Sequence, residues 1–375
     1  MTAPATARTP EFIHTAVGLG PEGLALDPAR RRGYVSCPRS NEVVAFDLDG
    51  GGMLGRVDVG REPIPVIYDP TGDRIFTADA RSDTVSVIDA ATFALLAQVP
   101  VAEYPAGLGF DEQRRKLYCG NTAGSSVTVI DVDRLEVLDH TPAALGAGSI
   151  AIDPVQGLVY CSNFMDDTIT VLDADTHEAR GDIRVGAAPC KVTIDAGRRR
   201  LYVANSLVAT LGVVDLDTGR VVDEYPIGGA PVGIMARPVD EVVYAADRGS
   251  GELVVIDTRD GATLARLPVG NGPGDVVWAE DTGIVYVSNA GSCSVTRVAD
   301  PRASDPRRAA TEATQAETTD GAACAVPWAT PAVAPHPLIG KPMPAFALPD
   351  MTTGEIRTIE EWQGKKYILN FFASW

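Results

Sequence analysis

One feature of the sequence constrains its fold more than any other: an aromatic residue recurs every 42 residues. Each copy lies in a short apolar stretch, such as L-Y-V-A-N at 201–205 or V-Y-V-S-N at 285–289. A column of aspartate and a column of proline keep the same period. The aromatic column is Tyr34, Phe76, Tyr118, Tyr160, Tyr202, Tyr244 and Tyr286; the aspartate column is Asp47, Asp89, Asp131, Asp173, Asp215 and Asp257; the proline column is Pro21, Pro63, Pro105, Pro189, Pro231 and Pro273. Three columns in phase over seven copies identify a repeat protein.

Each repeat predicts four short β-strands. Between 189 and 228, the apolar stretches V-T-I, L-Y-V-A-N, L-G-V-V-D and V-V-D-E-Y-P-I alternate with turn segments such as D-A-G-R and D-T-G-R. No helical periodicity of 3.6 residues runs through them. Four strands in about 40 residues are typical of one β-propeller blade. Seven blades close a ring without free sheet edges, so the sequence predicts an all-β, seven-bladed β-propeller over residues 11–300.

The two ends of the repeat region predict how the ring closes. Residues 11–17, E-F-I-H-T-A-V, align through the 42-residue period with V-D-E-Y-P-I at 222–227, which is the fourth strand of a blade. The last repeat supplies only three strands before D-P-R at 300–302. We therefore expect the N-terminal strand to pair with the strand near 294–299 and to complete the last blade.

The motifs Y-V-A-N at 202–205 and Y-V-S-N at 286–289 resemble those of the YVTN family of seven-bladed β-propellers. The resemblance covers roughly 11–300 and implies the same fold. It implies no single activity, because propellers carry many unrelated functions. Proteins of that family are often exported.

Net charge and hydropathy restrict the classes of partner that the chain is expected to bind. The formal net charge is −18, which argues against nucleic acid or an anionic membrane surface as a partner. No apolar run approaches the roughly 18 residues needed to span a bilayer. The N-terminus, M-T-A-P-A-T-A-R-T-P, lacks the basic and apolar regions of a secretory signal, so the sequence as printed predicts a cytoplasmic protein. We also expect a monomer. An earlier start would change that expectation to export.

The candidate site consists of residues that depart from their repeat columns at one mouth of the central channel. Loops before the innermost strand and loops after the aromatic strand should meet there. The candidates are Glu22, Arg39, Arg81, Cys190, Lys191, Arg248 and Asp275. Such a set could bind a small polar or anionic ligand, or a protein partner. The alternative is that these charges only solvate the rim.

Two aspartate-containing columns have simpler explanations. The column from Asp47 to Asp257 precedes turns and should cap their backbone N–H groups. A second column comprises Asp79, Asn121, Asn163, Asn205, Asp247 and Asn289. It either lines the mouth beside the arginines or caps turns.

Metal and nucleophilic chemistry receive little support. None of the histidines His14, His140, His177 and His336 is spaced as a metal ligand with a carboxylate or thiol, and no C-x-x-C occurs, so no cofactor is expected. Ring closure would bring Cys37 near Cys293, which leaves a bridge between them open. Propeller lactonases use carboxylates and basic residues at the mouth. An enzyme of that kind requires Glu22, Lys191 and Asp275 to share one pocket, whereas a binding scaffold does not.

The composition changes after the propeller. Residues 301–337 are rich in Ala, Thr, Pro and Asp, and predict a disordered linker. Residues 338–375 resemble the start of a redoxin-type thioredoxin-like domain, through G-K-P-M-P-A-F-A-L at 340–348, G-E-I-R-T-I at 354–359 and G-K-K-Y-I-L-N-F-F-A-S-W at 364–375. That resemblance implies a C-x-x-C directly after Trp375, where the printed sequence ends. The expected function is therefore a ligand- or partner-binding propeller fused to a thiol–disulfide oxidoreductase or peroxidase module without its redox cysteines; the alternative is a lactonase-like hydrolase or isomerase.

Overall fold

The computed structural model describes residues 13–299, 347–349 and 356–358. These residues belong to two units, one within Met1–Cys324 and one within Ala325–Trp375. The predicted linker at 301–337 lies outside the described residues, as does most of the segment at 338–375. No helix in the described part of the chain is long and apolar enough to cross a membrane.

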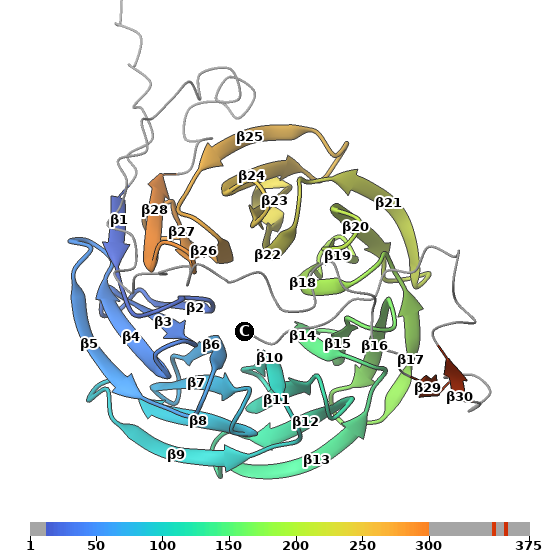
Figure 1. Cartoon of the computed structure of the whole chain (residues 1–375), viewed down its shortest axis with the longest axis horizontal. Helices are drawn as coiled ribbons and strands as arrows, with labels where there is room; N and C mark the ends of the chain where they lie inside the picture. The colour runs from blue at the N-terminus through green and yellow to red at the C-terminus, as the bar shows by residue number, and fades with distance from the viewer. Residues whose placement is uncertain (1–12, 300–346, 350–355, 359–375) are drawn as a thin grey trace, which may run out of the picture. The chain divides into compact units, whose positions relative to one another are not determined.

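Seven four-stranded antiparallel sheets stand around a central axis as propeller blades (Figure 1). In each of blades 1 to 6, four consecutive strands run from the innermost to the outermost position. Blade 1 contains β2 (Leu24–Asp27), β3 (Arg32–Cys37), β4 (Glu42–Asp47) and β5 (Met53–Asp58); blade 2 contains β6 (Pro63–Asp69), β7 (Arg74–Asp79), β8 (Thr84–Asp89) and β9 (Leu95–Pro100); blade 3 contains β10 (Pro105–Asp111), β11 (Lys116–Asn121), β12 (Ser126–Asp131) and β13 (Glu136–Pro142).

Blades 4 to 6 repeat this order, and blade 7 departs from it. Blade 4 contains β14 (Ala147–Asp153), β15 (Leu158–Asn163), β16 (Thr168–Asp173) and β17 (Ala179–Arg184); blade 5 contains β18 (Pro189–Asp195), β19 (Arg200–Asn205), β20 (Thr210–Asp215) and β21 (Arg220–Pro226); blade 6 contains β22 (Pro231–Arg237), β23 (Val242–Asp247), β24 (Glu252–Asp257) and β25 (Thr263–Pro268); blade 7 contains β26 (Pro273–Ala279), β27 (Ile284–Asn289), β28 (Ser294–Ala299) and β1 (Ile13–Ala16). In the second unit, β29 (Ala347–Pro349) pairs antiparallel with β30 (Ile356–Thr358).

The predicted ring closure is confirmed. Strand β1 forms the outermost strand of blade 7 and pairs antiparallel with β28, from Ile13 opposite Arg297 to Ala16 opposite Ser294. The backbone N–H of Val17 extends this ladder to the carbonyl of Cys293 at 3.0 Å. The first and last segments of the propeller therefore share one sheet. Cys37 carries a free, buried thiol, so no bridge joins it to Cys293.

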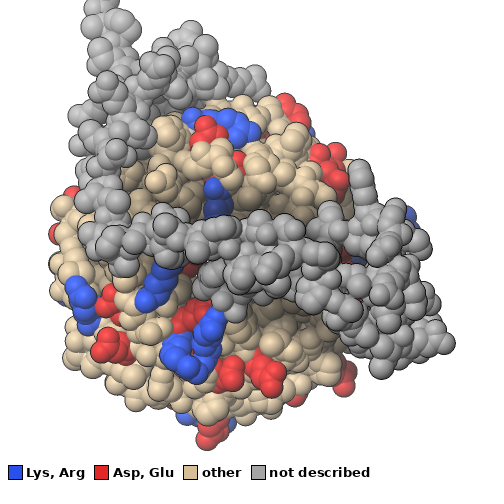
Figure 2. All heavy atoms as spheres, in the orientation of Figure 1, with Lys and Arg blue, Asp and Glu red and all other residues tan. Residues whose placement is uncertain are grey.

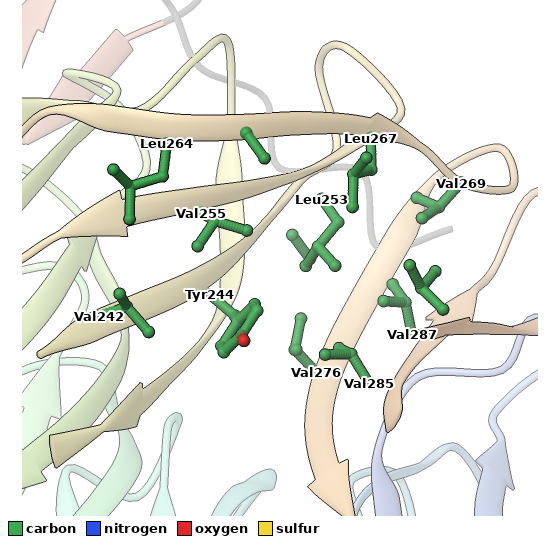
Figure 3. Close-up of a cluster of buried hydrophobic side chains, with 13 residues drawn as sticks. Val242, Tyr244, Leu253, Val255, Leu264, Leu267, Val269, Val276, Val285 and Val287 are labelled. Atoms are coloured by element: carbon green, nitrogen blue, oxygen red, sulfur yellow. The ribbon is translucent and has the colours of Figure 1, made fainter. Parts of the chain in front are cut away.

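The aromatic column forms the junctions between blades. All seven members of the column are at most 3% exposed. Each packs against the inner strands of the next blade; Tyr244 of blade 6, for example, shares a buried cluster with Val276 and Val285 of blade 7 (Figure 3). Because one large side chain recurs at the same place in every blade, seven equivalent apolar wedges hold the ring together.

The aspartate column from Asp47 to Asp257 caps turns, as predicted. At the turn after β12, for example, Asp131 Oδ1 accepts hydrogen bonds from the N–H groups of Asp133 and Arg134 at 3.0 and 2.9 Å. These carboxylates stabilise the backbone of the turns between strands, and they lie at the end of the blades opposite the predicted mouth.

At that same opposite end, arginine pairs connect the blades. The turns between the first and second strands of blades 1, 3 and 5 each contain two consecutive arginines. In blade 3, Arg114 reaches forward to Asp175 of blade 4 at 2.6 Å, and Arg115 reaches back to Asp69 of blade 2 at 2.6 Å. The equivalent pairs are Arg30–Asp73 and Arg31–Asp281 in blade 1, and Arg198–Glu241 and Arg199–Asp153 in blade 5. The remaining junction, between blades 6 and 7, has the Arg237 guanidinium 3.9 Å from the Trp278 ring centre.

A charged cluster at the channel mouth

The register of the blades shows that the two predicted sets of loops meet at one end. Proline begins most innermost strands, and it pairs directly with the last residue of the second strand, as in Pro189 opposite Asn205 and Pro231 opposite Asp247. The loop entering each innermost strand and the loop leaving each second strand therefore lie side by side. Together they form the mouth on which the candidate residues were placed.

Lys191 and Asp275 form an ion pair between blades that are not neighbours. Lys191 lies on β18 of blade 5 and Asp275 on β26 of blade 7, and Lys191 Nζ is 3.0 Å from Asp275 Oδ1. The equivalent residue of the intervening blade 6 is Gly233. A side chain there would meet the carbonyl oxygen of Gly274 at 2.1 Å, so this position stays without one.

Glu22 and Arg248 form a second long-range pair. Glu22 precedes β2 of blade 1 and Arg248 follows β23 of blade 6, and Arg248 Nη2 donates to Glu22 Oε2 at 2.7 Å. Blade 7, which lies between them, has Gly274 at the position of Glu22. A Cβ at Gly274 would lie 2.8 Å from Glu22 Oε2, so glycine leaves the space that the carboxylate occupies.

Hydrogen bonds join the two ion pairs into one cluster. The N–H of Asp275 donates to Ser288 Oγ at 2.8 Å, and Ser288 Oγ donates to the carbonyl oxygen of Glu22 at 2.5 Å. The four charged side chains keep partial solvent exposure: 32% for Lys191, 15% for Asp275, 27% for Glu22 and 40% for Arg248. We call Glu22, Lys191, Arg248 and Asp275 the mouth cluster. It contains two cations and two carboxylates that an incoming charged group can reach.

Burial and the neighbouring charges set the protonation of the cluster. Burial raises the pKa of Glu22, Asp275 raises it further, and the Arg248 and Arg39 cations oppose that shift. Cys190 lies beside the cluster, and its Sγ donates to the carbonyl of Pro231 at 3.2 Å. Burial raises the pKa of Cys190 to about 11, which Lys191 and Arg248 only partly offset, so it is a neutral thiol at pH 7.

Not all the predicted residues join the cluster. Arg81 forms an ion pair with Glu62, which also accepts a hydrogen bond from the Tyr104 hydroxyl at 2.9 Å, and this group lies on blades 2 and 3. Arg39 is exposed and makes no ion pair with any described residue; it lies near enough to Glu22 to lower its pKa. Figure 2 shows basic and acidic side chains close to one another at several places on the face in view.

The second asparagine and aspartate column lies inside the blades. Its six members are completely buried. Asn121 Nδ2, for example, donates to Ser126 Oγ at 3.1 Å and to Thr128 Oγ1 at 2.8 Å. These side chains brace the hairpin between the second and third strands, so they do not form the wall of the mouth.

Sequence reasoning missed the arginine pairs at the opposite end, although Arg-Arg recurs in every second blade at 30–31, 114–115 and 198–199. Within the described residues, no group of three potential ligands is arranged to hold a metal ion. An open cleft of about 410 Å³ lies on the rim, where β13 ends beside β17, and Thr170, Arg180 and Asp182 contribute to its lining.

Fold and cluster together define a seven-bladed β-propeller with a charged mouth. The sequence matches no known family, and it matches none of the curated proteins. Among solved structures, the chain is similar to hydrazine synthase of Kuenenia stuttgartiensis, with a TM-score of 0.69 and 18% sequence identity. The alignment covers 76% of this chain and 97% of that one. At this level of identity the likeness shows the propeller fold alone.

Proposed function

We propose that the propeller is a binding module, and that the mouth cluster with Arg39 recognises a small polar or anionic ligand or a charged group of a protein partner. One observation carries the proposal: four residues that break their repeat columns converge in two ion pairs that each skip a blade. In each case the intervening blade has a glycine at the corresponding position, Gly233 in blade 6 and Gly274 in blade 7. Partly exposed ion pairs contribute little to stability, so stability alone gives no reason for this convergence.

The cluster suits a charged ligand because its internal pairs can be exchanged. An incoming carboxylate can replace Asp275 on Lys191 or Glu22 on Arg248, and an incoming ammonium group can replace the cations. Charge-assisted hydrogen bonds of this kind are stronger than neutral ones. Arg39 has no ion-pair partner among the described residues, and it adds a third cation beside the two balanced pairs.

A thermal-shift screen of the full chain against carboxylates, amino acids and inorganic phosphate tests this proposal. A ligand present at 100 times its Kd stabilises the native state by about 2.7 kcal/mol, which raises Tm by several degrees. Lys191→Met should abolish the shift. Arg81→Met is the matched control, because Arg81 pairs with Glu62 away from the cluster and should leave the shift unchanged. A shift that survives Lys191→Met would refute the assignment of the site.

The enzyme alternative is a second candidate, and two features of the mouth cluster favour it. Glu22, Lys191 and Asp275 belong to one hydrogen-bonded cluster, and the raised pKa of Glu22 suits a proton donor. A hydrolase at this site should open lactones or esters, and Glu22→Gln should lower kcat at least 100-fold. Absence of turnover across a lactone and ester panel would exclude it.

We further propose that the propeller is the YVTN type and that residues 338–375 begin a redoxin module. The antiparallel pair of β29 and β30 supports the second part, since β29 overlaps the end of the motif at 340–348 and β30 lies within the motif at 354–359. A protein from the native locus that is longer than this chain, and that reduces insulin or peroxide, would support the fusion. A native mass of 39.4 kDa would contradict it.

A further inference from the structure

The mouth hairpin of blade 7 contains a cysteine where the other blades have residues of other kinds. Cys293 lies between β27 and β28, and its equivalents in blades 1 to 6 follow the 42-residue period. They are Asn41, Asp83, Ser125, Asp167, Ala209 and Gly251. All seven residues have a positive φ, which is 50° at Cys293. Glycine, asparagine and aspartate favour this left-handed conformation, so the backbone gives no reason for a cysteine.

In three other blades, the side chain at this position caps the loop that enters the next blade. Asn41 Oδ1 accepts a hydrogen bond from the N–H of Glu62 at 3.0 Å, and Asp83 Oδ1 accepts one from the N–H of Tyr104 at 2.9 Å. The same bond recurs in blade 4 at 2.9 Å. Sulfur is only a weak acceptor, so Cys293 gives up this turn cap at the junction where the ring closes.

The Cys293 sulfur is part of a disulfide. Its partner is not one of the free cysteines among the described residues. These are Cys37, Cys119, Cys161 and Cys190. The sequence contains six cysteines, and the one that remains is Cys324, which lies outside the described residues. We infer that Cys293 and Cys324 form an intrachain disulfide, which links the mouth hairpin of blade 7 to the segment that follows the propeller.

The free thiols are poorly suited to compete for this bond. Cys37 is the competitor across the ring closure: the N–H of Val17 donates to the carbonyl of Cys293 at 3.0 Å, and a Cβ at Gly18 would lie 2.6 Å from Cys37 Sγ. Cys37 is completely buried, and burial with the nearby Glu42 carboxylate raises its pKa to about 12. Burial raises the pKa of the other three free thiols as well. Because the thiolate is the form that attacks a disulfide, these neutral thiols exchange slowly at pH 7.

The bond forms by exchange with an oxidised dithiol protein, which is the co-reactant of this step. One thiolate attacks the disulfide of that protein and displaces one of its thiolates, and the second thiolate attacks the mixed disulfide and displaces the other. Cys293 and Cys324 together lose two protons and two electrons, and the disulfide of the oxidant becomes two thiols. Structural disulfides persist in oxidising compartments, so the inference predicts that the protein functions in one of them rather than in the cytosol. It does not depend on the ligand of the mouth.

Alkylation of the full chain, denatured without reductant, tests the inference. The protein is taken from its native cells, and its thiols are trapped in acid at lysis so that no exchange follows. Four cysteines should be alkylated before reduction and six after it. Proteolysis without reductant should release one cross-linked pair of peptides, which contains Cys293 and Cys324.

Two variants separate this bond from the other cysteines. Cys324→Ser should make Cys293 reactive, so that the counts with and without reductant become equal. Cys161→Ser is the matched control, which should lower both counts by one and keep the cross-linked pair. Full alkylation of the unaltered chain without reductant would overturn the inference, whether or not the variants fold. A cross-link from Cys293 to Cys37 or to a second copy of the chain would overturn it as well.

Discussion

Asp79 and Asp247 occupy the same position in two blades, and the structure predicts that an identical substitution has opposite effects on them. Asp79 is completely buried. Its Oδ2 accepts hydrogen bonds from Thr84 Oγ1 at 2.9 Å and Ser86 Oγ at 2.7 Å, while its Oδ1 has no partner among the described residues. Burial raises the pKa of Asp79 from 3.8 to about 6, against the effect of those hydroxyl donors.

The pKa shift sets the size and the sign of the effect. The unfolded chain releases this proton near pH 3.8 and the folded chain near pH 6, so the native state loses stability as pH rises between these values. The penalty at pH 7 is at most about 3 kcal/mol, at 1.36 kcal/mol for each pKa unit. Asp79→Asn removes the charge and reproduces the asparagine found in four other blades. Its amide can donate to Thr84 and Ser86, as Asn121 does to Ser126 and Thr128.

The control is Asp247→Asn. The Asp247 carboxylate accepts from the N–H groups of Gly229 at 3.0 Å and Ala230 at 2.8 Å, and from the Ser250 hydroxyl at 2.7 Å. Burial alone would raise the pKa of Asp247, but these donors hold it below its ordinary value. An asparagine there would place its NH2 group, which cannot accept a hydrogen bond, against backbone N–H donors. We therefore expect Asp247→Asn to lower the free energy of unfolding by roughly 1–3 kcal/mol.

Chemical denaturation followed by circular dichroism from pH 4 to pH 8 measures both effects. Asp79→Asn should stabilise the protein by roughly 1–3 kcal/mol above pH 6, and the gain should vanish near pH 4. Asp247→Asn should destabilise it at pH 7. The reasoning is refuted if Asp79→Asn destabilises the protein at pH 7, or if its gain does not depend on pH.

Three further perturbations follow from the same structure. Arg115→Ala leaves the buried Asp69 carboxylate without its bidentate partner and should lower the free energy of unfolding by about 3 kcal/mol. Arg134 is 71% exposed and lies 3.9 Å from Asp131, so Arg134→Ala should lower it by less than about 0.5 kcal/mol. Equal losses in the two variants would contradict this difference. Burial and the Lys116 cation hold the pKa of His177 below its ordinary value of 6.5, and they outweigh the opposite effect of Asp139 and Asp173. As pH falls, the unfolded chain therefore takes up this proton at a higher pH than the folded chain, and the protein loses stability below about pH 6.5. His177→Gln should flatten the dependence of Tm on pH between pH 7 and pH 5, and an unchanged slope would contradict this role of His177. Deleting residues 1–17 removes the β1 ladder and should lower stability by roughly 4 kcal/mol, so an unchanged Tm would disprove the role of ring closure.

Much of the fold could be read from the sequence because each blade is a local structure. Its four strands follow one another along the chain, and short turns set their register, so a 42-residue period specifies strands, aromatic core positions and turn caps together. Ring closure was also predictable, since the last repeat lacks one strand and the N-terminus supplies a matching one. The arginine pairs at the opposite end were not predicted, although Arg-Arg recurs in every second blade.

The candidate site was only partly predictable. The broken columns lie at the end of the channel where the mouth cluster forms, but no column shows which charges meet across the ring. Lys191 of blade 5 forms an ion pair with Asp275 of blade 7 because Gly233 of the intervening blade has no side chain in the way. Glu22 reaches Arg248 because Gly274 leaves room for the Glu22 carboxylate. Arg81, from an equivalent loop, instead pairs with Glu62.

The sequence by itself determined what repeats: the number of blades, their strands, their aromatic core and the closing strand. Only the tertiary structure decided what does not repeat. It separates Asp79 from Asp247, which share a column but face hydroxyl groups in one blade and backbone N–H groups in the other. It also joins Lys191 to Asp275 and Glu22 to Arg248, each across an intervening blade. The physical reason is that contacts within a blade depend on hydrogen bonding between chain neighbours, whereas contacts across the mouth depend on the shape of the closed ring.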